Sequence, residues 1–316
     1  MIRIGARRSP LAVAQAEWVA ARLAELGHPC ELLGIDSLGD VDRRRLTEIG
    51  GTGIFATAVR EQLLADRIDV AVHSLKDLPV APAPGLSVAA IPAREDVRDV
   101  LVGLRVEQWR DGTVVGTGSP RREVQLRQLA ADRGVEITVV PIRGNVDTRL
   151  SLVRDGQVDA TLLAAAGLLR LGRLDLQAVT TEVTQSQDVT IGDLPARLLA
   201  VDLMVPAAGQ GALAVECRSD APDEVLRALA ELDHAATRAA VTAERIFLST
   251  LEAGCLAPVG ALARGETDLT LTVVAGKQSS DGGLLRAVRD GSSADAEAIG
   301  AGLAQQVLPQ LRAGAE

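Results

Sequence analysis

Short apolar runs alternate, over the first two thirds of the chain, with longer segments in which apolar residues recur every three or four positions. The short runs are typical of buried strands, and the longer spacing is typical of helices. Strands that alternate with helices predict parallel, doubly wound sheets. The predicted strands of this part are 1–6, 31–36, 69–72, 86–91, 100–102, 114–116, 136–142, 160–163 and 213–217. The predicted helices are 10–26, 54–65, 119–131, 145–154 and 165–171.

The pattern changes near the C-terminus. A long helix is predicted over 235–251, and strand-like runs then follow one another at 259–263, 269–274 and 284–289 before a last helix from about 294. Consecutive strands packed by helices predict a small α+β domain. The length of 316 residues agrees with two or three domains rather than one.

Composition restricts the partners of the chain. Apolar residues make up 47% and aromatic residues only 1%, so the cores are built from Leu, Val, Ile and Ala, and stacking on nucleic-acid bases is not expected. The net charge of −9 argues against nonspecific binding to nucleic acid or to an anionic membrane. A local cluster of arginines runs against this average and is therefore informative.

Cysteine and histidine are sparse and dispersed. Cys30, Cys217 and Cys255 fit neither a disulfide framework nor a zinc knuckle, and three scattered histidines give little support to a metal site. The start MIRIGARRSP lacks the apolar stretch of a signal peptide, and no apolar run reaches the roughly 18 residues of a membrane helix. We therefore expect a cytoplasmic protein without a metal ion or a membrane segment.

Arginine-rich motifs follow predicted strands and open predicted helices. In Gly116–Arg122 (GTGSPRR), Ser119 caps a helix whose free N–H groups and partial positive charge favour an anion. Arg143–Arg149 (RGNVDTR) repeats this arrangement, with Asn145 as the cap, and Arg170 follows a third strand. Ligands of open α/β sheets bind beyond the carboxyl ends of strands, so these arginines could converge on one polyanion. The alternative is ordinary capped helices with solvated arginines.

Three further segments leave their chemistry open. Lys76 and Asp77 come just after a buried strand in AVHSLKDLP, where a carboxylate could serve acid–base chemistry or form a surface ion pair. Arg7 in ARRSPLA could bind a ligand or be solvated. Cys255 in LEAGCLAP lies in a predicted loop, and such a cysteine is either a small buried apolar residue or a reactive thiolate. These residues alone predict a two-domain α/β cleft for a polycarboxylate.

Together these motifs resemble the hydroxymethylbilane synthase (porphobilinogen deaminase) family. The resemblance extends over nearly the whole chain, in the family's order and spacing, through ARRSPLA, GGTGIF, VHSLKDLP, REDVRDV, VGTGSPRR, RGNVDTRL, AGLLRLG, GQGALAVECR and TAERIFLSTLEAGCLAPVG. It implies an α/β protein with two domains similar to type II periplasmic binding proteins flanking a cleft, plus a small α+β C-terminal domain. The implied limits are 1–95 with 206–229 for domain 1, 96–205 for domain 2 and 230–316 for domain 3.

The resemblance also implies a reaction, the stepwise deaminating polymerisation of four porphobilinogen molecules into hydroxymethylbilane in tetrapyrrole (porphyrin and heme) biosynthesis. The implied cofactor is a dipyrromethane, held by a thioether to Cys255, which primes the polymer. Each porphobilinogen loses ammonia to give an electrophilic methylene. The free α-carbon of the growing chain attacks that methylene, and a proton then leaves. The implied enzyme is a monomer whose partner is this small-molecule substrate.

Site residues are carried over from the family position by position. Asp77 matches the catalytic aspartate, whose carboxylate would stabilise the positive charge that develops as ammonia departs. Arginine suits the acetate and propionate groups of each pyrrole. The implied cofactor contacts are Cys255, Lys76, Ser119, Arg121, Arg122 and Gly144. The implied substrate contacts are Arg7, Ser9, Phe55, Arg143, Arg149 and Arg170.

One departure from the family concerns the Gly-rich loop before Phe55. Glu48 and Thr52 stand at positions that are lysines in other members, so the charge of the loop is lower. Loop closure could be weaker, or Arg43–Arg45 could substitute. Two alternatives to the enzyme are a noncatalytic binding protein for a small polyanion with the same fold, and an inactive relative with another role. The presence of Asp77 and Cys255 favours the enzyme.

Overall fold

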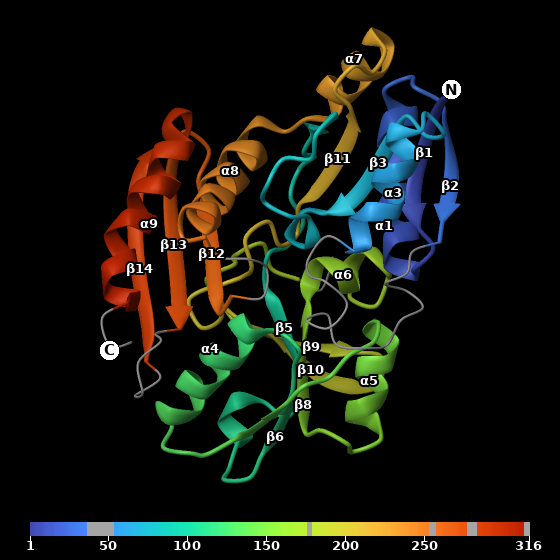
Figure 1. The fold of residues 1–316 in the computed structure, drawn as a ribbon. Coiled ribbons are helices and arrows are strands. Elements are labelled where there is room, and N and C mark those ends of the chain that lie inside the picture. Colours follow the sequence, from blue (N-terminus) through green and yellow to red (C-terminus); the bar gives the residue numbers. More distant parts are fainter. Residues whose placement is uncertain (37–53, 176–178, 253–256, 277–282, 313–316) are drawn as a thin grey trace.

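The computed structural model describes residues 1–36, 54–175, 179–252, 257–276 and 283–312, with only the backbone for 54 and 55. Within these ranges it has sheets of five, six and three strands, each covered by helices. Figure 1 shows the five-stranded sheet at the upper right, the six-stranded sheet below and the three-stranded sheet at the left. The expected α/β architecture with a separate α+β region at the C-terminus is confirmed.

The five-stranded sheet has the order β2-β1-β3-β11-β4. Its strands are β1 (Ile2–Arg7), β2 (Cys30–Ile35), β3 (Val70–Ser74), β4 (Leu86–Ala90) and β11 (Leu213–Arg218). Its helices are α1 (Pro10–Glu25), α3 (Ile54–Leu64) and α7 (Asp223–Leu232), and the 3-10 turn η1 (Leu75–Asp77) follows β3. Helix α1 begins as predicted, because Ser9 Oγ accepts a hydrogen bond from Ala12 N at 3.4 Å and Pro10 follows it.

The six-stranded sheet has the order β7-β6-β8-β5-β10-β9. Its strands are β5 (Asp99–Gly103), β6 (Val114–Gly116), β7 (Thr138–Val140), β8 (Ala160–Ala164), β9 (Gln187–Ile191) and β10 (Leu194–Leu198). Its helices are α4 (Pro120–Ala131), α5 (Val146–Arg154) and α6 (Ala165–Arg170), with a short turn η2 (Val106–Gln108). Strands β9 and β10 form a hairpin that we did not predict from the sequence.

The three-stranded sheet is the antiparallel meander β12-β13-β14. Its strands are β12 (Val259–Arg264), β13 (Asp268–Gly276) and β14 (Leu284–Ser292). Helices α8 (Ala235–Thr250) and α9 (Ala296–Arg312) pack on it, after the short turn η4 (Ser293–Asp295). Phe247 of α8 is fully buried in this core, which otherwise consists of aliphatic side chains.

The expectation of parallel sheets is correct only in part. Strands β1, β2 and β3 are parallel, as are β6, β7 and β8, but β11 is antiparallel to both β3 and β4. Likewise β5 is antiparallel to β8 and β10. The chain completes the six-stranded sheet before β11 returns to the five-stranded sheet, and β11 then runs in the opposite direction to β3 and β4. Both large sheets are therefore mixed.

Two chain crossings, residues 91–98 and 199–212, join the two large sheets and contact each other. Gln210 Nε2 donates to Val97 O at 2.7 Å, and Glu95 N donates to Gly211 O at 3.3 Å. Gly211 has a φ of +87°, and a Cβ there would lie 2.4 Å from Glu95 O, so only glycine fits. The predicted domain limits at 95 and 206 fall within these crossings, whereas the limit at 229 falls inside α7, and the division into domains stays a prediction.

Candidate active site

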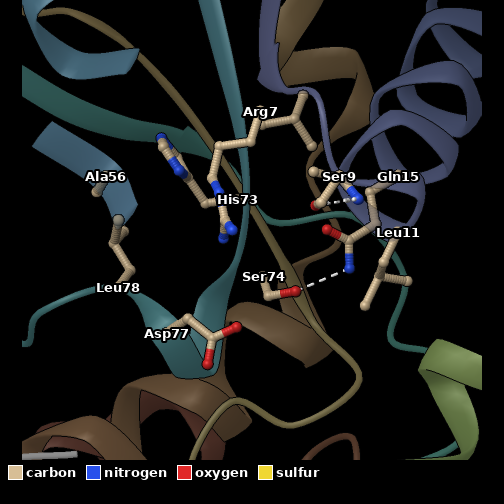
Figure 2. Close-up of a pocket in the computed structure, with 11 residues that line it drawn as sticks. Arg7, Ser9, Leu11, Gln15, Ala56, His73, Ser74, Asp77 and Leu78 are labelled. Atoms are coloured by element: carbon tan, nitrogen blue, oxygen red, sulfur yellow. Dashed lines mark hydrogen bonds between the residues drawn. The ribbon is translucent and has the colours of Figure 1, made fainter. Parts of the chain in front are cut away.

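A polar pocket lies at the carboxyl ends of β1 and β3, which are parallel neighbours. Because these strands run in the same direction, Arg7 and Ser74 at their ends reach the same edge of the sheet. Ser9 at the start of α1 and Asp77 in η1 also line the pocket, which holds about 470 Å³ including space open to solvent. Figure 2 shows Arg7 and Asp77 extending into it from opposite sides.

The pocket wall is fixed by buried polar contacts. Gln15 Nε2 donates to Ser74 Oγ at 2.8 Å, which joins α1 to the end of β3. Behind His73, the Glu216 carboxylate accepts hydrogen bonds from Arg60 Nε at 2.9 Å and Nη2 at 2.7 Å. His73 Nε2 lies 3.2 Å from the same carboxylate. Burial favours protonation of Glu216, but His73 and Arg60 lower its pKa to about 2.

Lys76 lies beside Asp77 in η1, where many protein atoms surround it although it keeps some solvent exposure. Burial lowers its pKa to about 8, against the opposing effect of the Asp77 charge. The charges of Arg122, Asp99 and Arg121 also act on it. Lys76 therefore connects the pocket of the first sheet with a charged group on the second sheet.

That charged group is built around Asp99, which is fully buried at the start of β5. Asp99 Oδ2 accepts a hydrogen bond from Arg121 Nη1 at 2.8 Å, and Oδ1 accepts from Arg122 Nη2 at 2.6 Å and from Gln210 Nε2 at 3.2 Å. Burial opposes ionisation of Asp99, but the two guanidinium groups outweigh it and hold its pKa well below its usual range. Asp99 is thus a buried carboxylate that compensates two buried cations.

Arg121 and Arg122 therefore differ from the solvated arginines that the sequence left open as the alternative. Both are buried at the first turn of α4, where Ser119 Oγ accepts a hydrogen bond from Arg122 N at 3.5 Å. Arg122 Nη1 also donates to Leu162 O at 2.8 Å, and Arg121 Nη1 donates to Val205 O at 2.7 Å. Among the described residues, Arg121 Nε is buried without a hydrogen-bond partner. Sequence reasoning missed Asp99, because nothing local marks it as the partner of this motif.

Arg149 and Arg170 are half-buried arginines that form no ion pair among the described residues. Arg149 Nε donates to Gly144 O at 3.0 Å, and Arg170 Nη2 donates to Gly211 O at 2.8 Å, but neither forms an ion pair in the described part of the chain. Burial lowers the pKa of each to about 10. Arg122 lowers the pKa of Arg149 further and the charge of Asp77 raises it, so the pocket carboxylate and this arginine of the six-stranded sheet act on each other electrostatically.

The structure brings some of the predicted residues together and leaves others outside its description. One pocket includes Arg7, Ser9 and Asp77, and the charges of Lys76, Arg122 and Arg149 act on this region. Gly144, with a φ of +103°, supplies the carbonyl that holds Arg149, whereas Arg143 is exposed at the same turn. Cys255, Glu48, Thr52 and Arg43–Arg45 lie outside the described residues, as does the side chain of Phe55.

Neither a metal-binding cluster nor a membrane-spanning helix occurs within the described ranges. No group of three or more His, Cys, Asp or Glu side chains there could hold a metal ion. Helices of these ranges all fall short of the length and apolar character needed to cross a membrane.

Comparisons with known proteins identify the class of the chain. Residues 2–226 match the family model described as porphobilinogen deaminase, dipyromethane cofactor binding domain, and residues 238–309 match the porphobilinogen deaminase C-terminal domain. The chain therefore belongs to the porphobilinogen deaminase family, as the sequence motifs indicated. The match to the first model also confirms the expected dipyrromethane-binding character of this family.

Individual relatives agree with this assignment. The chain is 53% identical over 266 residues to porphobilinogen deaminase 1 of Streptomyces coelicolor, which covers 83% of this chain and 77% of that protein. It is 48% identical over 284 residues to the porphobilinogen deaminase of Thermobifida fusca, covering 89% and 82%. A periplasmic substrate-binding protein of an ABC transporter from Coxiella burnetii is 13% identical, with a TM-score of 0.39 over 73% of this chain and 91% of that one.

Proposed function

We propose that this chain is a hydroxymethylbilane synthase, a transferase that joins four porphobilinogen molecules, with loss of ammonia, into hydroxymethylbilane for porphyrin and heme biosynthesis. The observation that carries the proposal is that Arg149 and Arg170 are half-buried cations without ion pairs among the described residues, and that the charge of the pocket residue Asp77 acts on Arg149. A desolvated guanidinium gains most from a carboxylate that arrives with a ligand. Porphobilinogen brings two such groups, an acetate and a propionate.

The same residues fit the covalent dipyrromethane that the family uses. Arg121 Nε is buried and lacks a described partner, and Lys76 carries its proton below its pKa of about 8, so both can bind carboxylates. Ser119, Arg122 and Gly144 are the other residues we assign to holding this group, with the thioether at Cys255. When bound, the dipyrromethane supplies the pyrrole α-carbon to which the first substrate is joined.

Asp77 is the residue that we assign to the chemistry. Its carboxylate lines the pocket and is exposed to it, so it can accept a hydrogen bond from a pyrrole N–H. Departure of ammonia leaves positive charge on the pyrrole ring, and a fixed carboxylate nearby stabilises that charge. Asp77 can also carry the proton that is released when the new bond forms.

The remaining substrate contacts follow the carboxylates. Arg7 and Ser9 line the pocket opposite Asp77, and we assign them, with Arg143, Arg149 and Arg170, to the acetate and propionate groups. Phe55 is assigned to packing against a pyrrole ring on the basis of the family resemblance. The proposal further includes a monomer in the cytoplasm, and the net charge of −9 argues against a nucleic-acid partner.

A noncatalytic binding protein for a small polyanion would also need the arginines, but it would have no use for a carboxylate at position 77. A carboxylate inside an anion site repels the ligand and weakens its binding. The exposed carboxylate of Asp77 in the pocket therefore favours the enzyme over the binding protein.

The test is to incubate the purified protein with porphobilinogen and to follow ammonia and the linear tetrapyrrole together. We expect four ammonia molecules to be released for each tetrapyrrole formed. Binding of porphobilinogen without release of ammonia would support the binding protein instead.

A further inference from the structure

Helix α8 holds the turn that carries Asp77. Arg245 lies in the last part of this helix, and its guanidinium reaches three backbone carbonyls of the first domain. Nη2 donates to Pro79 O at 2.7 Å, while Nη1 donates to Leu78 O at 3.1 Å and more weakly to Leu75 O at 3.4 Å. These carbonyls come before and after Lys76 and Asp77 along the chain, so Arg245 holds the backbone on both sides of these two residues.

The turn η1 needs support from outside because it contains few hydrogen bonds of its own. A 3-10 turn of three residues leaves its last carbonyls without partners inside the turn, and the end of η1 is capped by a hydrogen bond from Leu78 N to Leu75 O at 3.1 Å. The buried side chains of Leu75 and Leu78 anchor the turn on either side of Lys76 and Asp77. Arg245 supplies the missing donors from another part of the fold.

The helix that carries Arg245 is itself firmly placed. Its neighbour Glu244 is fully buried and accepts hydrogen bonds from Arg94 Nη1 at 2.6 Å, from Gly209 N at 2.7 Å and from Ala263 N at 2.9 Å. One carboxylate thus ties α8 to both chain crossings and to β12. Because α8 is held in place independently of η1, a hydrogen-bond donor on α8 can fix the position of η1.

We propose that Arg245 is a positioning residue for the reaction, which holds the backbone of η1 so that the Asp77 carboxylate points into the pocket. This inference rests on the proposed function, in which Asp77 stabilises the developing positive charge. Helix α8 also leads in the sequence toward Cys255, so Arg245 links the helix before the cofactor cysteine with the turn of the carboxylate.

Arg238 offers a matched control on the same helix. Arg238 lies about two helical turns before Arg245. It also donates hydrogen bonds to backbone carbonyls of the first domain, from Nη2 to Ala89 O at 3.0 Å and from Nη1 to Val88 O at 3.4 Å. These carbonyls belong to β4 and its end, away from η1. A loss that comes only from loosening α8 would affect both arginines alike.

The first measurement is amide hydrogen exchange over residues 70–80 in Arg245→Gln, Arg238→Gln and the unchanged protein. We expect at least about tenfold faster exchange in 75–79 for Arg245→Gln only. This readout does not depend on turnover, so it tests the inference even if the proposed function fails. Unchanged exchange in Arg245→Gln, or equal acceleration in Arg238→Gln, would overturn the inference.

The second measurement is steady-state turnover of porphobilinogen. We expect Arg245→Gln to lower kcat about 10- to 100-fold, because a displacement of about 1 Å at a reacting group costs this much, while KM changes less than about threefold. Arg238→Gln should keep kcat within about twofold. Should Arg245→Gln fold poorly, Arg245→Lys, which retains the charge and one donor site, should show an intermediate kcat and an intermediate exchange rate. A normal kcat in both Arg245 variants contradicts the proposal, whereas absent turnover in the unchanged protein contradicts the proposed function alone.

Discussion

Arg122 donates two hydrogen bonds to a single oxygen of Asp99, from Nη2 at 2.6 Å and from Nε at 3.1 Å, and both side chains are buried. Arg121 donates to the other oxygen of the same carboxylate. One negative charge therefore compensates two positive charges, and a net positive charge remains near Lys76 and Arg149. This arrangement gives an acidic protein a positive region in its cleft.

Replacing Asp99 tests the structural half of this arrangement. Asp99→Asn leaves two buried guanidinium groups without a counter-charge, and breaking a buried ion pair from one side costs about 3–5 kcal/mol. We expect the free energy of unfolding in urea to fall by this amount. Asp188→Asn is the control, because Asp188 pairs with Arg105 at the surface and such pairs contribute about 0–1 kcal/mol. Equal losses for the two variants would contradict the role of Asp99.

Replacing Arg149 tests whether this positive region binds the substrate. Arg149→Leu removes a half-buried charge that has only a carbonyl partner among the described residues, so stability should change by less than about 1 kcal/mol. Turnover should fall at least about 100-fold, because a carboxylate contact is lost. Arg154→Leu on the same helix removes an exposed arginine paired with Asp193 and should leave turnover nearly normal. An Arg149→Leu protein that unfolds would favour a structural role for this residue.

The pKa of Lys76 predicts a dependence on pH. This group is protonated below about pH 8 and loses its positive charge as the pH rises through that value. If the charge binds carboxylates, KM for porphobilinogen should increase between pH 7 and pH 9. In Lys76→Arg the charge persists because the guanidinium keeps its proton over this range. The increase should then be absent, and the same increase in both proteins would exclude Lys76 as its cause.

The sequence patterns predicted where helices begin better than they predicted which charged side chains are buried. The caps Ser9, Ser119 and Asn145 are local signals, and each accepts the hydrogen bond expected of a helix cap. Burial of Arg121 and Arg122 could not be predicted, because their partner Asp99 lies 22 and 23 positions away and is matched to them only by folding.

For the fold as well, features set by neighbouring residues could be predicted from the sequence, whereas features set by residues far apart in the chain could not. The β9–β10 hairpin had a readable signal that we missed, a Gly-Asp turn at 192–193 between two strands that pair from Ile191 and Leu194. By contrast, the insertion of β11 between β3 and β4 depends on pairing over more than 100 residues, and no local pattern specifies it.

Replacing Asp77 separates chemistry from cofactor attachment. Asp77→Ala should retain the mass of the attached cofactor, because Asp77 is not assigned to holding it, but should almost abolish turnover of porphobilinogen. The loss follows from removing the carboxylate that stabilises positive charge in the pocket. Near-normal turnover in this variant would remove Asp77 from the catalytic role.

Intact mass of the purified protein is the most direct test of the proposed chemistry. Produced in cells that make porphobilinogen, the chain should exceed its sequence mass by two linked pyrrole units, and Cys255→Ser should lack this excess. Cys30→Ser, a change at a partly exposed cysteine of the described residues, should retain it. A folded protein with the bare sequence mass, or an excess that persists in Cys255→Ser, would contradict polymerisation on a cofactor held by Cys255.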